Sequence, residues 1–425
     1  MTALASVKGR DADFRLSLLY AATFFEMGVQ IPFLPIWLGA RGLSDGQIAI
    51  ALAAPMALRV VATPFVAALA DRRNDVAGVL TAAAIVLASS CAFLGFLSGF
   101  APLLVAVAIL LCAQGIVMPL TDALTASVLR ANEDAPGGRL EYGRIRKWGS
   151  AAYIAGNLFG GLYLNVVSID GVTIALTAAA ILGVAACLYA APLGALGRPE
   201  AHESAERVET RGLGLLPFVI ATAALIQSSH ALLNTFGSLH WAREGHSTAF
   251  VGSAWAIGVV CETSVFALAG RWFAGPDRAF AMLTLAGAVA TLRWLVMATN
   301  PATVVLLAAQ SGHGLTFAMT HLGSMHFIID NAPARIRARA QGWFAASVAG
   351  ASALVVALSG PLYAHFGEVA YLAMALLAAA GLTLTIVLAA RQAALRSGAA
   401  SGSQKELGAS RTMLRGGPDK AAAGE

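Results

Sequence analysis

Three ionisable residues interrupt apolar stretches in the second half of the sequence: Glu262, Arg293 and His313. A charge near the centre of a bilayer costs about 2.5 kcal/mol or more, so such residues usually face a wet cavity and pair with one another. We predict that Glu262 and Arg293 form an ion pair that opens when the carboxylate is protonated. Histidine is the side chain best suited to exchange protons under physiological conditions, so His313 is expected to relay the proton or bind the substrate. A permanent ion pair that only joins two helices is the alternative.

Further polar residues recur at helical spacing within the apolar stretches. Gln310, His313 and Phe317 are three or four residues apart, which places them on one helical face and predicts that they line a cavity. His230 and Asn234 repeat this spacing in an earlier stretch. For these two residues, cavity lining and hydrogen bonding between helices are equally well supported.

The first half of the sequence carries fewer such residues. Glu26 and Gln30 lie one helical turn apart, and a carboxylate in this apolar stretch is unfavourable unless it faces the protein interior. Glu26 is therefore a candidate second proton site and, with Gln30, a candidate substrate contact. Arg59 either meets an anion or pairs with Glu26 or Asp122, and the sequence does not decide between these partners.

The composition indicates which elements hold these residues. Of the 425 residues, 58% are hydrophobic and 12% are charged, whereas soluble domains have roughly 45–50% and 25%. A helix needs about 20 apolar residues to cross the hydrocarbon layer. The sequence therefore predicts an all-α polytopic membrane protein with 12 transmembrane helices, over residues 14–38, 47–70, 76–98, 102–128, 146–166, 172–192, 215–240, 248–270, 279–299, 303–328, 341–363 and 369–390.

Two features divide these helices into pseudo-symmetric halves of six. The segment 198–212 replaces apolar sequence with alternating charges, which is typical of a solvated linker. The sequence ALADR (68–72) after the second helix recurs as ALAGR (267–271) after the eighth. The predicted division is an N-terminal segment at 1–13, a six-helix half at 14–192, a linker at 193–214, a second six-helix half at 215–390 and a disordered tail at 391–425.

The basic residues predict the orientation. Most of the 28 Lys and Arg residues fall in cytoplasmic segments if both termini are cytoplasmic, so the positive-inside rule places both termini there, in a bacterial inner membrane. Asp71 and Arg72, between the second and third helices, are predicted to gate the cavity. Simple retention of positive charge on the inside is the alternative for Arg72. The four cysteines lie singly in different stretches, and no cofactor or metal site is predicted.

Several segments resemble the phenylpropionate permease group of the major facilitator superfamily, a branch related to lactose permease and nucleoside proton symporters. The resemblance extends through all twelve predicted helices and implies the major facilitator fold, with a substrate site between the two halves. The segments that carry it are PLTDAL (119–124), YGRIRKWGSAAY (142–153), WAIGVVCETSVFAL (255–268), RW (293–294) and QSGHGLTFAMTHL (310–322).

The resemblance also implies roles for single residues. Asp122 and Arg146 occupy the places where lactose permease holds a carboxylate and an arginine that engage substrate. Glu262, Arg293 and His313 fall where that family member keeps its coupling carboxylate, arginine and histidine. The sequence departs at one place, because lactose permease has a proton-carrying glutamate one turn after the histidine and Thr316 stands here.

Together these observations predict a proton-coupled symporter that imports a small organic acid, such as a phenylpropionate-like aromatic carboxylate, by alternating access. A proton-driven exporter of drugs or metabolites and a sugar or nucleoside permease are the alternatives among transporters. A membrane sensor or a polytopic membrane enzyme is the alternative from other classes, although the sequence has no HExxH, GxSxG or P-loop motif. The predicted partners are the substrate, protons and the lipid bilayer, without nucleic acid, and the predicted oligomeric state is a monomer.

Overall fold

The computed structural model describes residues 9–132, 140–196, 213–273 and 277–415, which form helices and connecting turns with no strand among them. The first half contains α1 (Gly9–Ala40), α2 (Asp45–Arg73), α3 (Val76–Leu94), α4 (Phe100–Ala131), α5 (Tyr142–Val167) and α6 (Val172–Ala190), followed by a short 3-10 helix (Ala191–Leu196). The second half contains α7 (Leu216–Ser228), a π-helical turn (Leu233–Gly237), α8 (Ser238–Arg243), α9 (Thr248–Trp272), α10 (Arg278–Met297), α11 (Thr303–Ser311), α12 (His313–Asn331), α13 (Ala334–Phe366) and α14 (Tyr371–Arg415).

The predicted apolar stretches coincide with these helices. Each stretch corresponds to one helix or, at 215–240 and 303–328, to two consecutive helices. Within the described residues, nine segments are long and apolar enough to cross a membrane, and one of them, Arg339–Ala394, runs through both α13 and α14. The all-α membrane fold predicted from the sequence is confirmed.

Local sequence signals set where several helices begin. Ser44 and Gln47 form a reciprocal capping box at the start of α2, with hydrogen bonds of 3.0 and 3.4 Å. Asp75 caps α3 by accepting a hydrogen bond from the Gly78 backbone nitrogen at 2.8 Å, and Ser247 caps α9 through the Phe250 nitrogen at 3.2 Å. These caps satisfy backbone N–H groups in the first turns of α2, α3 and α9.

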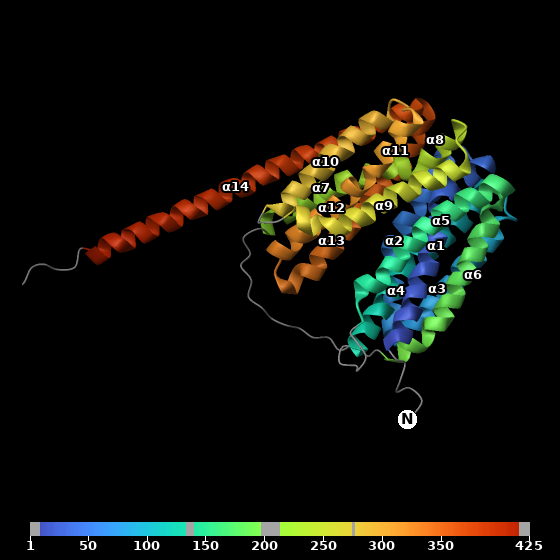
Figure 1. Ribbon diagram of the computed structural model, residues 1–425, viewed down its shortest axis with the longest axis horizontal. Helices are drawn as coiled ribbons and strands as arrows, with labels where there is room; N and C mark the ends of the chain where they lie inside the picture. Colours follow the sequence, from blue (N-terminus) through green and yellow to red (C-terminus); the bar gives the residue numbers. More distant parts are fainter. Residues whose placement is uncertain (1–8, 133–139, 197–212, 274–276, 416–425) are drawn as a thin grey trace, which may run out of the picture.

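The helices form two bundles, α1–α6 and α7–α14, that meet through α2 against α13 and α5 against α9. In Figure 1 the two bundles lie close together near α8 and α11 and diverge toward the end from which the N-terminus emerges. We call the first region the closed end and the opposite region the terminal end.

Close backbone packing and one ion pair hold the closed end together. The hydroxyl of Thr248 in α9 donates to the Gly161 carbonyl of α5 at 2.9 Å. A Cβ atom on Gly252 would collide with the Asn157 carbonyl oxygen of α5, so glycine is what lets these two helices touch. Arg243 of α8 donates two hydrogen bonds, of 2.7 and 3.2 Å, to the Asp45 carboxylate at the start of α2. The halves are therefore joined at this end.

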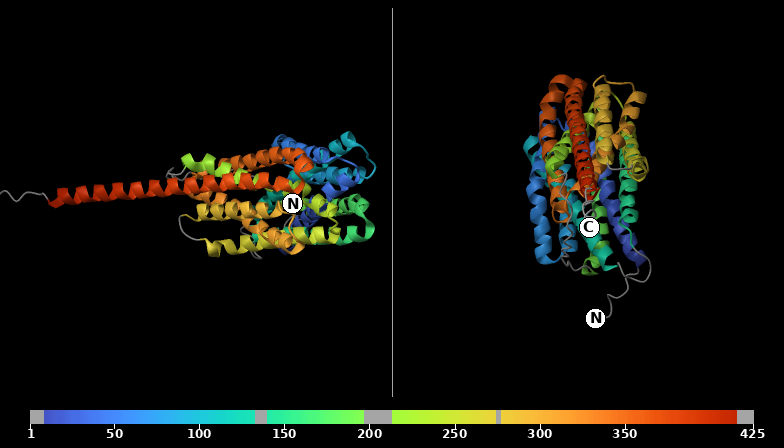
Figure 2. Two further views of the ribbon diagram at one scale, coloured as in Figure 1. Left: turned by 90° about the horizontal axis from the view of Figure 1, so that it is seen from above. Right: turned by 90° about the vertical axis from the view of Figure 1, so that its left-hand side faces the viewer.

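The end of the chain differs from the prediction. We expected a disordered tail from residue 391, but α14 continues to Arg415 and projects from the bundle as a single helix (Figures 1 and 2). The segment 391–415 is rich in alanine and other good helix formers, and no proline interrupts it before Pro418. Its helical propensity therefore outweighs the scattered glycines and serines. Residues 416–425 and most of the predicted linker lie outside the described residues.

Candidate functional site

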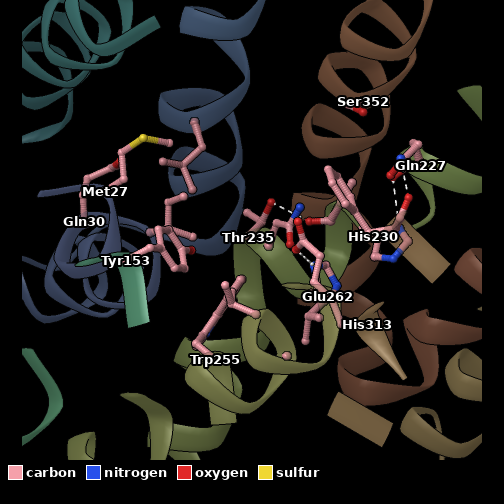
Figure 3. Close-up of a pocket in the computed structure, with 18 of the residues that line it drawn as sticks. Met27, Gln30, Tyr153, Gln227, His230, Thr235, Trp255, Glu262, His313 and Ser352 are labelled. Carbon is pink, nitrogen blue, oxygen red and sulfur yellow. Dashed lines mark hydrogen bonds and ion pairs between the residues drawn. The ribbon is translucent and has the colours of Figure 1, made fainter. Parts of the chain in front are cut away.

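A cavity of about 570 Å³ lies between the two bundles. Its wall is built by α1, α2, α4 and α5 of the first half and by all the helices from α7 to α13 except α8, with the π-helical turn between them. Figure 3 shows Gln30 and Tyr153 on one side and Gln227, His230, Glu262 and His313 on the other. The predicted residues that line the cavity are Gln30, Arg59, Arg146, His230, Asn234, Glu262, Arg293, Gln310, His313 and Phe317.

Glu262 of α9 pairs with His313, the first residue of α12. The distance between His313 Nε2 and Glu262 Oε2 is 3.4 Å, and the two side chains are 17% and 22% exposed. Gly314 makes this pairing possible, because a Cβ atom there would lie 2.6 Å from the Glu262 backbone nitrogen. The His313 ring also stacks on Phe317, with 5.6 Å between ring centroids. The pair therefore combines two groups that each accept or release a proton.

Arg293 of α10 is held differently from our prediction. Its side chain is 4% exposed, and its Nη2 donates to Gln310 Oε1. Its Nε and Nη1 are buried without a hydrogen-bond acceptor in the described part of the chain, where no carboxylate lies within 4.0 Å. The predicted Glu262–Arg293 ion pair is not formed, because the close approach at Gly314 brings His313 to Glu262 and Gln310 binds the guanidinium. Arg293 thus keeps unsatisfied donors beside the cavity.

His230 and Thr316 form a buried polar contact beneath this wall. His230 Nε2 lies 2.8 Å from the Thr316 hydroxyl, and His230 Nδ1 lies 3.2 Å from the carbonyl oxygens of Ile226 and Gln227. Nδ1 donates to these carbonyls, because only a protonated nitrogen can bond to a carbonyl oxygen. The Thr316 hydroxyl also donates to the His313 carbonyl oxygen at 3.0 Å, so it links the two histidines. Thr316, which stands where lactose permease has a glutamate, is therefore the hydrogen-bond partner of His230.

The first half contributes a buried carboxylate behind the cavity wall. Gln114 Nε2 donates to Glu26 Oε2 and to Gln30 Oε1, each at 2.8 Å. Gln30 and Gln114 line the cavity, whereas Glu26 is 2% exposed and is not part of its lining. The sequence prediction missed Gln114. A glutamine in the middle of the apolar stretch 102–128 was the signal that could have found it.

Asp122 and Arg146 form no ion pair in the described part of the chain, although both lie against Tyr20. Tyr20 and Tyr142 donate hydrogen bonds to Asp122 Oδ1, the latter at 3.1 Å, and Asp122 does not line the cavity. Arg146 does line it, with its guanidinium carbon 4.1 Å from the centroid of the Phe24 ring. The tyrosines bind the carboxylate and the aromatic ring of Phe24 holds the cation. The role of Asp122 and Arg146 in substrate binding stays a prediction.

The remaining predicted residues are placed without the partners we considered. Arg59 lines the cavity and lies against Gly115, and within the described ranges it has no carboxylate partner within 4.0 Å. Asp71 and Arg72 are exposed in the last turn of α2 at the terminal end, where the halves diverge. Their proposed gating role stays a prediction.

Sequence comparison gives one family and two curated relatives. The family described as "MFS_1 like family" matches residues 14–373. A protein of Escherichia coli (strain K12) named "Probable 3-phenylpropionic acid transporter" is 28% identical over 386 residues, covering 85% of this chain and 94% of that protein. The "Maltose permease" of Geobacillus stearothermophilus is 26% identical over 383 residues, covering 88% of this chain and 94% of that protein.

Solved structures share the fold at low sequence identity. The nucleoside transporter NupG has a TM-score of 0.68 at 15% identity, covering 89% of this chain and 98% of that chain. The peptide transporter POT in complex with sulfate has a TM-score of 0.66 at 15% identity, covering 89% of this chain and 94% of that chain. All these relatives are named as transporters or permeases, and the solved ones share the fold of this chain.

Proposed function

The chain belongs to the MFS_1 like family of membrane transporters, and from this premise we propose that it is a proton-coupled symporter that imports a small organic acid by alternating access. The observation that carries the proposal is Arg293, a buried guanidinium beside the cavity whose Nε and Nη1 lack acceptors in the described chain. Buried donors without partners are costly, and a carboxylate from outside would satisfy them.

The charges of the site support coupling of one proton to one anion. Arg293 keeps its positive charge in any protein setting. When the Glu262–His313 pair holds one proton, the pair is neutral and a bound carboxylate cancels the charge of Arg293. When the pair holds no proton, Glu262 itself offsets that charge. Glu262, His313 and Arg293 together are therefore neutral when they hold both the proton and the anion or neither of them, while Arg59 and Arg146 contribute the same charge in every state.

This neutrality restricts which states convert between the two orientations. A site that holds only the anion, or only the proton, carries a net charge inside the membrane, which is costly. Loaded and empty proteins therefore change orientation more readily than half-loaded ones. That difference is the physical requirement for accumulating a substrate with a proton gradient.

The substrate class rests on the cavity and on the named relative. Arg59, Arg146 and Arg293 place three positive charges in the cavity wall. Among the described residues that line the cavity, Glu262 is the one acidic residue. Trp255, Phe24 and Phe317 add aromatic surface that suits a ring. We infer an aromatic monocarboxylate, and 3-phenylpropionate is the first compound to test because the relative from Escherichia coli is named for it.

The orientation and cellular location follow from the charge distribution. We propose that the terminal end faces the cytoplasm of a bacterial cell, because the basic residues concentrate in the segments at that end. The conformation in which the two halves are joined at the closed end would then be the one that releases substrate into the cytoplasm. We further propose that the transporter works as a monomer, because the cavity is complete within one chain.

Uptake into liposomes tests the proposal. We expect an inside-alkaline pH gradient to raise the initial rate of 3-phenylpropionate uptake by the protein. Protein-free liposomes must be subtracted, because the protonated acid itself crosses bilayers. Competition by maltose or by nucleosides, without competition by the acid, would favour the sugar or nucleoside permease. Binding without counterflow of labelled acid would favour a sensor.

A further inference from the structure

Glu26 of α1 is a buried carboxylate that has no counter-charge among the residues the structure describes. Its side chain is 2% exposed, and within those residues its Oε1 has no hydrogen-bond partner. Its Oε2 accepts one hydrogen bond of 2.8 Å, from the neutral amide of Gln114. In the described part of the chain, no basic nitrogen lies within 4.0 Å of it. An ionised carboxylate in this setting has little to compensate the loss of water.

The titratable groups on the elements packed against α1 do not supply that charge. Arg146 and Tyr153 lie on α5, Arg59 lies on α2 against Gly115, and Cys91 of α3 is a buried thiol. Other groups are engaged elsewhere or buried among apolar residues: Arg144 with Asp13, Arg243 with Asp45, Asp122 with Tyr20 and Tyr142, His240 with Tyr363, Glu262 with His313, and Cys187 in the core of the first half.

Gln114 connects this carboxylate to the cavity. Its Nε2 uses both hydrogens, one for Glu26 Oε2 and one for Gln30 Oε1, at 2.8 Å each. Gln30 and Gln114 both line the cavity. A substrate oxygen that takes a hydrogen from Gln114 therefore competes with Glu26 for it. Losing this hydrogen bond disfavours the ionised form of Glu26 further, because nothing else in its surroundings stabilises the charge.

We propose that Glu26 is a second proton-binding site of the transporter, filled when the substrate engages Gln114. This inference rests on the proposed function and deepens it. Glu26 binds its proton at a carboxylate oxygen, in addition to the proton on the Glu262–His313 pair. Two protons then accompany each substrate anion: the one that balances the anion at Glu262, His313 and Arg293, and a second one that neutralises the buried charge of Glu26 itself. Gln114 is a positioning residue that transmits occupancy of the cavity to the buried carboxylate.

The number of linked protons is measurable without a membrane. The Kd of radiolabelled 3-phenylpropionate is determined for the purified full-length protein in detergent, from neutral to alkaline pH, where the acid itself stays ionised. Linkage then predicts that at its steepest the Kd of the unmodified protein rises about 100-fold per pH unit, and that of Glu26→Gln about 10-fold. Glu262→Gln, which removes the other site, is also expected to give about 10-fold.

Two further variants make the result decisive. Glu26→Asp keeps a titratable group and is expected to keep the steeper dependence, displaced along the pH axis. Glu141→Gln changes an exposed carboxylate at the start of α5 and serves as the matched control. If Glu26→Gln does not fold, the slope of folded Glu26→Asp decides, and a loss of the second proton there overturns the proposal.

Other outcomes overturn the inference without touching the proposed function. An unmodified protein that binds one proton, with Glu26→Gln showing the same slope, leaves Glu26 as a packing residue. A Kd that depends on sodium concentration through Glu26 replaces the proton with a metal cation. A Kd of the unmodified protein that is independent of pH contradicts proton coupling itself and therefore the proposed function.

Discussion

Replacing Arg293 with methionine removes the guanidinium while keeping an unbranched side chain of similar length. The structure gives Arg293 one hydrogen bond to Gln310 and leaves its Nε and Nη1 without acceptors in the described chain. If a carboxylate of the substrate occupies those nitrogens, the variant loses a buried charged pair. Such truncations cost about 2–5 kcal/mol. The Kd of 3-phenylpropionate should therefore rise about 30-fold to 4,000-fold.

The assay compares the acid with its uncharged amide on the purified protein. Arg293→Met should lose affinity for the acid much more than for 3-phenylpropionamide, because only the acid carries the charge. Arg293→Lys keeps the charge without the fork of donors and is expected to fall between the two. Arg391→Met, which alters an exposed arginine of α14, is the control. Equal losses for acid and amide, or an unchanged Kd for the acid, would refute the assignment.

Three further changes test other parts of the structure. Glu262→Gln should slow gradient-driven uptake, which then depends on the proton at Glu26 alone, but permit counterflow, because the amide mimics the protonated carboxylate; uphill uptake at the normal rate would contradict the charge scheme. Gly252→Val should push α5 away from α9 at the closed end. The separation is measured by electron spin resonance as a longer distance between spin labels at Asp170 and Glu244, in a protein without the native cysteines. Gly270→Val is the control, because its side chain would meet open space and should leave this distance unchanged. Asp45→Asn removes a half-exposed ion pair with Arg243 that is worth about 0.2–1 kcal/mol. The ratio of short to long distances between the same two labels should therefore change by no more than about fivefold. A larger change would mean that this ion pair alone holds the closed end together.

The sequence was sufficient for the architecture because the bilayer imposes it. Apolar stretches of membrane-spanning length, such as 102–128, coincide with helices, and caps such as Ser44 and Asp75 lie where local sequence signals place them. The family suggested by the motifs is confirmed by the match over residues 14–373. These features depend on neighbours in the sequence and on the solvent, so they are readable without a structure.

The pairing of charges was not readable in the same way. The sequence brought Glu262, Arg293 and His313 to one cavity but assigned the wrong ion pair. Which base meets Glu262 depends on the contact of α12 with α9 at Gly314, a distance between helices that no local pattern encodes. Likewise, nothing in the sequence indicated that two tyrosines from other helices bind Asp122.

The helical tail was missed because two local sequence signals conflict there. There the glycines and serines of 391–415 suggested disorder, whereas the summed propensity of alanine, leucine, lysine and glutamine continues α14 to Arg415. Gln114 was passed over because a single amide in an apolar helix is common. Its importance appears only when Glu26 and Gln30 are seen to share its donor group.

Initial-rate uptake of 3-phenylpropionate into proteoliposomes, with Glu262→Gln proteoliposomes as the baseline, tests the joint binding of proton and anion most directly. An inside-alkaline gradient should accelerate uptake by the unmodified protein above that baseline, and a protonophore should remove the difference. Equal rates for the two proteins, or acceleration that survives the protonophore, would contradict the account.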